Sequence, residues 1–325
     1  MACMELYLST SDYLRNFDRF IGGLSFADPQ KLHIASHPKW INVHPAVLAF
    51  TATLALTVGR EHVEFDDFTA SSAHYLDRMG LFNFTKNKSP YQIAHNEPAG
   101  KFIPLTIIKN SADQSQFITD MIPLLHLPSE KTDPIKYTIG ELVRNVLEHS
   151  YSSSGAVVAA QYYKKTNTVR IGICDNGIGI RQSMNKFWHP KDDIDAIKLA
   201  LMPGISGTTH REGGTEDNAG AGLYFIKSIA QVARNYFLIY SGSAIYKLLL
   251  HDKRIKNARL HPDPNDEKHS ERNNAPDFHG TLVAIDITLD SDARDFEKLM
   301  GDIRESYTLA VRERKKLKYR EPRFA

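Results

Sequence analysis

Apolar and polar residues follow one another along the first third of the chain in short blocks, a pattern typical of a mixed α/β unit. The run AVLAFTATLALTV at 46–58 is apolar apart from its threonines, which predicts a buried helix. It is shorter than the roughly 20 residues that a membrane-spanning helix needs. Further apolar runs and helical spacings predict the remaining elements of this part. The predicted strands are 32–35, 63–65 and 102–108, and the predicted helices are 71–79 and 113–125.

A polar stretch with two prolines, 127–134, separates this part from the next. It ends in a helix-start signal, because Asp133 can cap free backbone N–H groups and Pro134 suits a first helical position, where no donor is needed. We expect the helix to continue to about His149. Apolar residues at spacings of four and three give it one face that packs on a core. They are Ile135, Ile139, Leu142 and Val146.

The second part of the chain alternates between strand and helix patterns in a way that predicts a sheet covered by helices. The polar stretch 251–278 is rich in His, Asn, Asp and Pro, so we expect a loop insertion there. From residue 293 the pattern is helical and becomes strongly basic. The other predicted elements are strands 156–163, 168–174, 236–240, 245–250 and 281–288 and a helix at 221–234.

These patterns predict an α/β protein with two domains, which suits a chain of 325 residues. Residues 1–127 form an N-terminal α/β domain for regulation or interaction. Residues 128–290 form an α/β sandwich in which helices cover a mixed, mostly antiparallel sheet. Residues 291–325 form a C-terminal helix with a basic tail.

Composition narrows the classes of function. Hydrophobic residues make up 42% and charged residues 24%, which is typical of a globular protein and argues against wholesale disorder. Forty basic and 38 acidic residues give a net charge of +2, so we do not expect a protein that coats nucleic acid along its whole surface. The basic segment 312–323 is the one place where nucleic acid could bind, and a solvated basic helix is the alternative.

Cysteine and histidine usage argues against a disulfide scaffold and against a zinc site. The two cysteines, Cys3 and Cys174, cannot make a disulfide scaffold and fit a reducing compartment. The N-terminus has no basic segment followed by an apolar run, so we expect no secretory signal and a soluble, cytoplasmic chain without membrane contact. The histidines at 251, 261, 269 and 279 are spaced too irregularly for a zinc site.

The helix at 134–149 carries a polar stripe as well as its apolar one. Glu141, Asn145 and His149 are four residues apart, so they share a face. A carboxylate can take a proton, and an amide oxygen can bind a hard cation. The stripe is therefore a candidate ligand face, and an amphipathic helix with solvated polar residues is the alternative.

Two glycine-containing segments complete the candidate chemistry. Asp175-Asn-Gly177-Ile-Gly179-Ile180 follows an apolar strand, where a carboxylate could accept a hydrogen bond from an exocyclic amine. A plain Asp-Asn-Gly turn is the alternative. The segment 204–223 ends in Gly220-Ala221-Gly222-Leu223 at a helix start, which favours anions through free N–H groups and the helix dipole. It has neither a Walker nor a dinucleotide fingerprint, and a flexible surface loop is the alternative.

In their order and spacing these motifs resemble the GHKL, or Bergerat-fold, ATPase superfamily. That group includes gyrase, the MutL mismatch-repair proteins, a heat-shock chaperone, sensor histidine kinases and anti-sigma-factor kinases. The resemblance extends over roughly residues 130–290 and includes His279-Gly280-Thr281 on the last strand. The glycine run before the helix is most similar to the histidine-kinase and anti-sigma branches.

The resemblance implies ATP and Mg²⁺ as ligands. Asn145 would hold Mg²⁺, Glu141 would orient and deprotonate the nucleophile, and Asp175 would read the adenine amino group with Thr281 nearby through a water. Lys227, on the helix that follows, is interpreted as a surface residue. The other nucleotide contacts implied are Gly177, Gly179 and Ile180 at the adenine pocket, Gly220, Ala221, Gly222 and Leu223 at the phosphates, and Thr208 and Thr209 in a mobile lid.

The function expected from the resemblance is ATP hydrolysis that drives a conformational switch, acting on the N-terminal domain, a protein partner or a second copy of the chain. A Ser/Thr kinase of the anti-sigma type and a non-catalytic nucleotide-sensing scaffold are the alternatives. No phosphoacceptor helix precedes the ATP-binding motifs, so autophosphorylation on histidine is not expected. The segment 75–82 is faintly similar to STAS domains, the partners of anti-sigma kinases, and an unrelated α/β module is the alternative.

Overall fold

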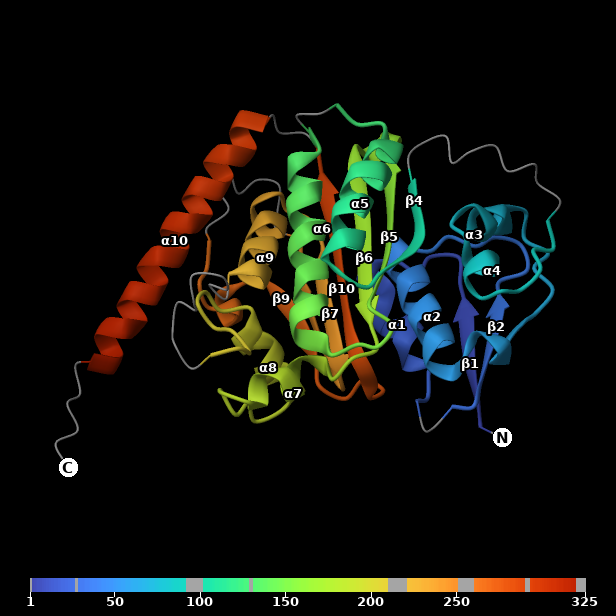
Figure 1. The fold of residues 1–325 in the computed structure, drawn as a ribbon, viewed down its shortest axis with the longest axis horizontal. Coiled ribbons are helices and arrows are strands. Elements are labelled where there is room, and N and C mark those ends of the chain that lie inside the picture. Colours follow the sequence, from blue (N-terminus) through green and yellow to red (C-terminus); the bar gives the residue numbers. More distant parts are fainter. Residues whose placement is uncertain are drawn as a thin grey trace.

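The computed structural model contains two β-sheets with helices on them and between them (Figure 1). This confirms the predicted α/β class. Among the residues that it describes, no helix is both long and apolar enough to cross a bilayer. The described residues are 2–26, 29–91, 102–128, 131–209, 221–250, 260–289 and 293–319.

The smaller sheet has three parallel strands in the order β1-β2-β3. Its strands alternate buried and exposed residues, so one face packs inward; in β1, for example, Met4, Leu6 and Leu8 are buried. The prediction missed β1, whose six residues alternate apolar with polar ones too briefly to stand out. The elements of this part are β1 (Cys3–Leu8), α1 (Phe17–Gly22), β2 (Lys31–Ser36), α2 (Pro45–Val58), β3 (Val63–Phe65), α3 (His74–Arg78) and α4 (Leu81–Phe84).

The larger sheet has seven strands in the order β4-β5-β6-β10-β7-β8-β9, and every neighbouring pair is antiparallel. The longest strand, β10, lies in the middle and pairs with β6 and β7. The antiparallel character expected from the sequence is therefore present, whereas the parallel pairing of a mixed sheet does not occur among the described strands of this sheet. The strands are β4 (Phe102–Ile108), β5 (Ala156–Tyr163), β6 (Thr168–Asp175), β7 (Phe237–Gly242), β8 (Ala244–Leu248), β9 (His269–Arg272) and β10 (Phe278–Thr288).

Three local assignments differ from the sequence prediction. β4 was grouped with the N-terminal residues, but it pairs with β5 and is an edge of the larger sheet. β9 lies within the expected loop insertion and pairs with β8. Asp133 is not the cap of its helix, because Thr132 is the residue before the first turn and makes no side-chain cap bond. The two strand assignments depend on pairing with distant segments, which local pattern does not contain.

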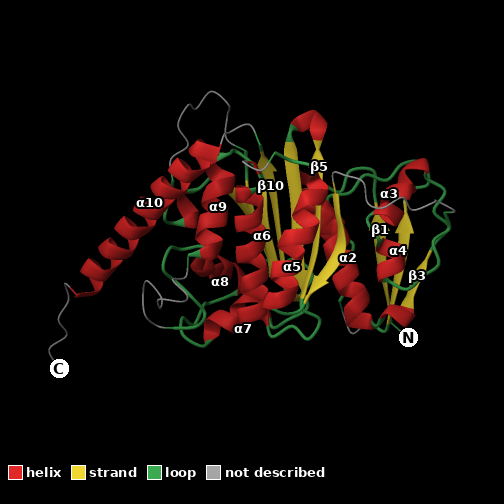
Figure 2. Cartoon of the chain, turned by 45° about the horizontal axis from the view of Figure 1, so that its top comes forward, coloured by secondary structure: helices red, strands yellow, loops and turns green. Residues whose placement is uncertain are grey.

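One face of the larger sheet is covered by helices that carry apolar stripes (Figure 1). The long α10 packs its first half on α9, where the Tyr224 and Ser306 hydroxyls are 2.8 Å apart. Its second half extends away from the body of the molecule (Figure 2). These helices are α5 (Ser111–Met121), α6 (Asp133–Asn145), α7 (Gly179–Asn185), α8 (Asp193–Ala200), α9 (Gly222–Val232) and α10 (Ala293–Tyr319).

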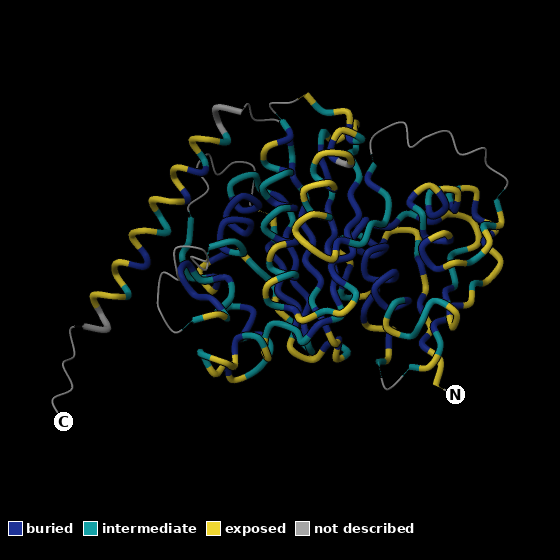
Figure 3. The backbone as a smooth tube through the Cα atoms, in the orientation of Figure 1, coloured by how far each residue is buried: buried dark blue, intermediate teal, exposed yellow. Residues whose placement is uncertain are grey.

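The opposite face of the larger sheet packs on α2, which lies between the two sheets. Every residue of α2 from Pro45 to Ala55 is buried, which explains its apolar run (Figure 3). The helix approaches the sheet so closely that a Cβ on Gly172 would lie 2.1 Å from the Cα of Ala46. The two sheets therefore share one hydrophobic core through α2.

A buried polar contact fixes the start of α2 against the larger sheet. The Nδ1 atom of His44 accepts the Ala46 N–H at 3.0 Å, so Nε2 carries the proton and donates to Asp286 on β10 at 2.9 Å. Complete burial lowers the pKa of His44, which favours this neutral form. Arg170 on β6 lies near Asp286 and over the ring of Tyr13. The contact thus joins the N-terminal residues to the two central strands.

We expect Gly172→Ala to lower the free energy of unfolding by about 2–3 kcal/mol, because the added methyl group would overlap the backbone of α2. Urea denaturation followed by circular dichroism measures this change. Gly301→Ala is the matched control, since a Cβ there meets nothing within 4 Å, and it should stabilise α10 by up to about 1 kcal/mol. Equal stability of Gly172→Ala and the wild type would contradict the close approach of α2.

Candidate functional site

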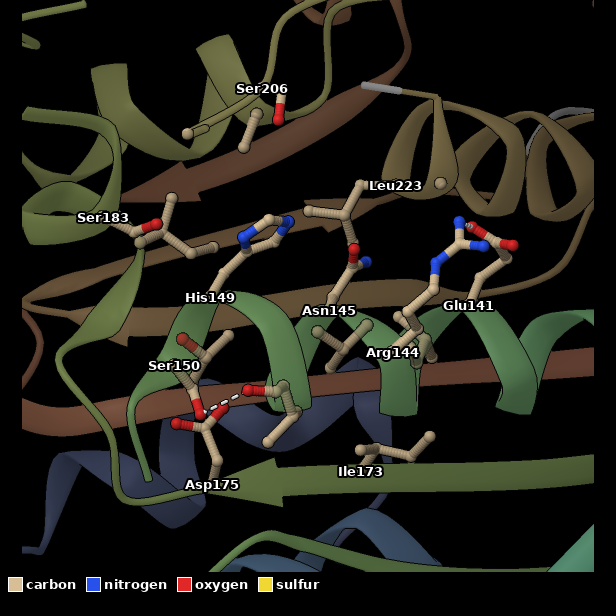
Figure 4. Close-up of a pocket in the computed structure, with 18 of the residues that line it drawn as sticks. Glu141, Arg144, Asn145, His149, Ser150, Ile173, Asp175, Ser183, Ser206 and Leu223 are labelled. Atoms are coloured by element: carbon tan, nitrogen blue, oxygen red, sulfur yellow. Dashed lines mark hydrogen bonds and ion pairs between the residues drawn. The ribbon is translucent and has the colours of Figure 1, made fainter. Parts of the chain in front are cut away.

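A cavity of about 260 Å³ opens between α6, the end of β6, α7 and the first turn of α9 (Figure 4). It combines apolar walls with polar groups that converge from several elements, which is the usual character of a small-molecule site. Most residues singled out in the sequence lie in its wall. They are Glu141, Asn145, Asp175, Gly179, Ile180, Ala221, Gly222, Leu223 and Thr281.

Asp175 lies at one end of the cavity, at the last position of β6 and opposite Thr281 on β10. Its side chain is only 2% exposed, and one carboxylate oxygen accepts the Gly177 N–H at 2.8 Å. Burial raises the pKa of Asp175 to about 7, although hydrogen bonds from the Gly177 and Thr281 backbones act in the opposite direction. The carboxyl group therefore titrates near pH 7, and it is available to a ligand that donates a hydrogen bond.

The turn after Asp175 is glycine-rich for a different reason than expected. A Cβ on Gly177 would lie 2.0 Å from the carbonyl oxygen of Ser150, so this glycine lets the turn pack on the end of the α6 segment. The Ile178 N–H donates to the same carbonyl at 2.8 Å. Gly177 does not line the cavity, whereas Gly179 and Ile180 do. The turn therefore ties the Asp175 end of the cavity to α6.

The polar face predicted for α6 points into the cavity, with Glu141, Asn145 and His149 along it (Figure 4). After Asn145 the helix widens into a π-turn, Val146–Ser150, a feature that occurs frequently at functional sites. The wider turn brings both His149 and Ser150 to the cavity wall. Burial lowers the pKa of His149, which favours the neutral imidazole.

Glu141 lies at the opposite end of the cavity from Asp175 (Figure 4). Its Oε2 atom is 2.5 Å from Nη2 of Arg144, one turn further along α6. Burial raises the pKa of Glu141, and the guanidinium of Arg144 opposes that effect. This end of the cavity therefore holds a carboxylate and a cation in contact.

The first turn of α9 lies directly over Glu141 and Asn145. A Cβ on Gly222 would lie 2.7 Å from Oε2 of Glu141 and 3.5 Å from Nδ2 of Asn145. A helix start presents free N–H groups and a partial positive charge, so this end of the cavity suits an anion. The Asn145 Nδ2 atom is buried and has no hydrogen-bond partner in the described part of the chain. An unsatisfied buried donor of this kind is costly, and a bound ligand would satisfy it.

The segment before residue 210 contributes other residues than the two threonines expected. Ser206 and Gly207 line the cavity, whereas Thr208 and Thr209 do not. The Trp188 indole N–H donates to the Ser206 carbonyl at 2.8 Å and holds this segment in place. Gly220 and the rest of 210–220 lie outside the described residues.

Sequence reasoning missed several residues of the wall and misplaced one nearby. Tyr137 and Arg144 are one turn from Glu141, so helical periodicity could have found them. Ser183 comes from α7, which had no clear pattern. Lys227 is fully buried rather than exposed, because its ammonium group pairs with Glu267 at 2.9 Å. That pair ties α9 to the segment around Glu267, a contact with no local signal.

No protein-family model matches the chain, and no curated protein matches it. Within the described residues, no group of three or more His, Cys, Asp or Glu side chains is placed to hold a metal ion.

We expect Asp175→Asn to stabilise the ligand-free protein at pH 8 by about 2–4 kcal/mol, because it removes a carboxylate that is costly to bury. The folded-state pKa lies above the unfolded one, so the wild type loses stability as the pH rises from about 4 to about 7. The stability gap should therefore close as the pH falls. Thermal unfolding across this range measures it.

The exposed Asp302 on α10 provides the control. Asp302→Asn removes an equal charge from the surface and should leave the pH dependence of stability as in the wild type. An Asp175→Asn protein with the wild-type pH dependence would show that the buried carboxyl group does not titrate as described.

Proposed function

We propose that this protein binds ATP together with Mg²⁺ in the cavity and hydrolyses it, and that hydrolysis drives a conformational switch. The observation that carries the proposal is that the two ends of the cavity differ in their chemistry. One end holds the buried acceptor Asp175, and the other end holds Glu141 and Asn145 beneath the first turn of α9. A nucleotide also has two chemically different ends, with a flat base at one end and phosphates at the other.

The Asp175 end suits adenine. Ile173, Ile180 and Met184 supply apolar wall for a flat ring, and the carboxylate of Asp175 accepts a hydrogen bond from an exocyclic amine. Guanine carries a carbonyl at the corresponding position, which would face the carboxylate without a proton between them. With the base held in that orientation, the buried acceptor favours adenine over guanine, whose own exocyclic amine lies at another position of the ring.

The α9 end suits phosphates and a divalent cation. The free N–H groups at the start of α9 can donate to phosphate oxygens. The amide oxygen of Asn145 is a ligand of the type that Mg²⁺ prefers, and Mg²⁺ commonly takes one or two protein oxygens with the rest from phosphates and water. The ion would neutralise phosphate charge, which is the main electrostatic demand of phosphoryl transfer. The unpartnered Nδ2 group of Asn145 is buried in the same wall and could donate to a phosphate oxygen while the amide oxygen binds the ion.

Glu141 is the residue we assign to proton transfer. Its carboxylate lies at the phosphate end and is partly buried, and that burial raises its pKa toward the range of a useful general base. It can orient a water molecule and accept its proton as the terminal phosphoryl group leaves. Asn145 lies four residues further along the same helix face, where it would hold the phosphates in position for attack by that water.

The contact between the cavity and the N-terminal residues supports a switch. Asn176, next to Asp175, donates from Nδ2 to the Thr57 hydroxyl near the end of α2 at 3.4 Å. It also accepts from Ser152 at 2.8 Å. A ligand that moves the Asp175 turn would therefore act on α2 and, through the shared core, on the smaller sheet. The order of motifs and the helix-covered antiparallel sheet support the resemblance to GHKL ATPases as well.

Incubation with γ-labelled ATP and Mg²⁺ tests the proposed reaction directly. We expect the label to appear as free phosphate. Label transferred to a protein would instead favour the Ser/Thr kinase alternative, and binding without either product would favour a nucleotide-sensing scaffold. Absence of any ATP binding would overturn the proposal.

We expect Glu141→Gln to reduce the rate of ATP hydrolysis by about 100-fold or more while the protein still binds Mg·ATP, because the amide cannot accept the proton. Steady-state phosphate release and equilibrium binding measure the two effects. Glu305→Gln is the control, since Glu305 is exposed on α10 and does not line the cavity. A wild-type rate in Glu141→Gln would remove Glu141 from the mechanism.

A further inference from the structure

The ion pair between Glu141 and Arg144 occupies the phosphate end of the cavity and is not used by the reaction as proposed. The two side chains point toward one another there (Figure 4), with 2.5 Å between Oε2 of Glu141 and Nη2 of Arg144. Arg144 is 44% exposed, whereas Glu141 is 15% exposed, so the guanidinium can change partner more easily than the carboxylate. A second carboxylate, Glu148, lies 3.9 Å from Nε of Arg144.

The position of this pair along α6 determines which part of a ligand could reach it. Glu141 and Ser150 are nine residues apart, which is roughly 13 Å along the helix axis. Ser150 lies beside the Asp175 turn, which would hold the base. Only the far end of an extended phosphate chain would therefore meet Arg144.

The first turn of α9 brings an anion to the same place. A Cβ on Gly222 would lie 2.7 Å from the Glu141 oxygen that pairs with Arg144. A phosphate held by the α9 N–H groups would therefore approach both members of the pair. It would repel the carboxylate and attract the guanidinium, which can bind phosphate through two parallel N–H donors.

We propose that Arg144 recognises the terminal phosphate of the nucleotide and that this phosphate replaces Glu141 as its partner. The inference rests on the proposed function and adds a sensor of the third phosphate to it. In the ligand-free cavity Arg144 holds the Glu141 carboxylate. When a triphosphate binds, Arg144 turns to the terminal phosphate and the freed carboxylate can accept a hydrogen bond from the attacking water.

Calorimetric titration with the β,γ-imido analogue of ATP and with ADP, each with Mg²⁺, tests the proposal. We expect Arg144→Ala to weaken binding of the triphosphate about 10- to 100-fold and binding of ADP less than about twofold, because only the triphosphate reaches the guanidinium. Arg144→Lys keeps the charge without the planar fork and should give an intermediate loss. Melting curves of both variants confirm that they are folded.

Two further variants sharpen the test. Glu141→Gln removes the competing carboxylate, so it should strengthen binding of the triphosphate relative to ADP. Arg181→Ala is the matched control, because Arg181 is 45% exposed on α7 and does not line the cavity. Its guanidinium donates to the Lys191 carbonyl. Neither affinity should change in this variant.

The outcomes separate the two proposals. Equal losses for both nucleotides in Arg144→Ala, or no loss for either, would overturn the role of Arg144 and leave ATP binding intact. Glu141→Gln changing both affinities equally would overturn the exchange of partners. Wild-type protein that binds neither nucleotide would overturn the proposed function together with this inference.

Discussion

The burial of the Asp175 carboxyl group at the end of β6 is the constraint on which the rest of the site depends. A carboxylate with 2% exposure is costly, and only two backbone N–H groups offset that cost in the ligand-free protein. The buried carboxylate therefore lowers the stability of the ligand-free protein. It is well suited to a ligand that supplies the missing donor, and a strongly perturbed carboxyl group in a cavity is for this reason a candidate for a functional site.

The position of that carboxyl group is set by packing on both sides of the larger sheet. On one side, the Gly177 turn packs on the π-turn of α6, which also carries His149 to the cavity. On the other side, α2 presses on Gly172 and reaches Asn176 through Thr57. The N-terminal residues therefore belong to the structure that shapes the cavity, and movement of the turn is transmitted to a core that both sheets share.

Local pattern predicted much of this arrangement, and its failures have a common physical cause. The helix at 46–58 and the polar face of Glu141 and Asn145 follow from periodicity within one segment, and both are present. The sheet to which β4 belongs, the strand β9 and the burial of Lys227 depend on partners far along the chain. The Arg144 ion pair could have been anticipated from its spacing to Glu141, but its place at one end of a cavity could not.

Calorimetry with ATP and with GTP, each with Mg²⁺ near pH 7 and in two buffers of different ionisation enthalpy, tests the central claim most directly. If Asp175 accepts a hydrogen bond from the adenine amine, ATP should bind and release a proton, because that bond favours the ionised form of a carboxyl group whose pKa is about 7. GTP should bind far more weakly. Folded protein that gives no heat of binding with ATP, or that binds GTP as tightly as ATP, would contradict the account.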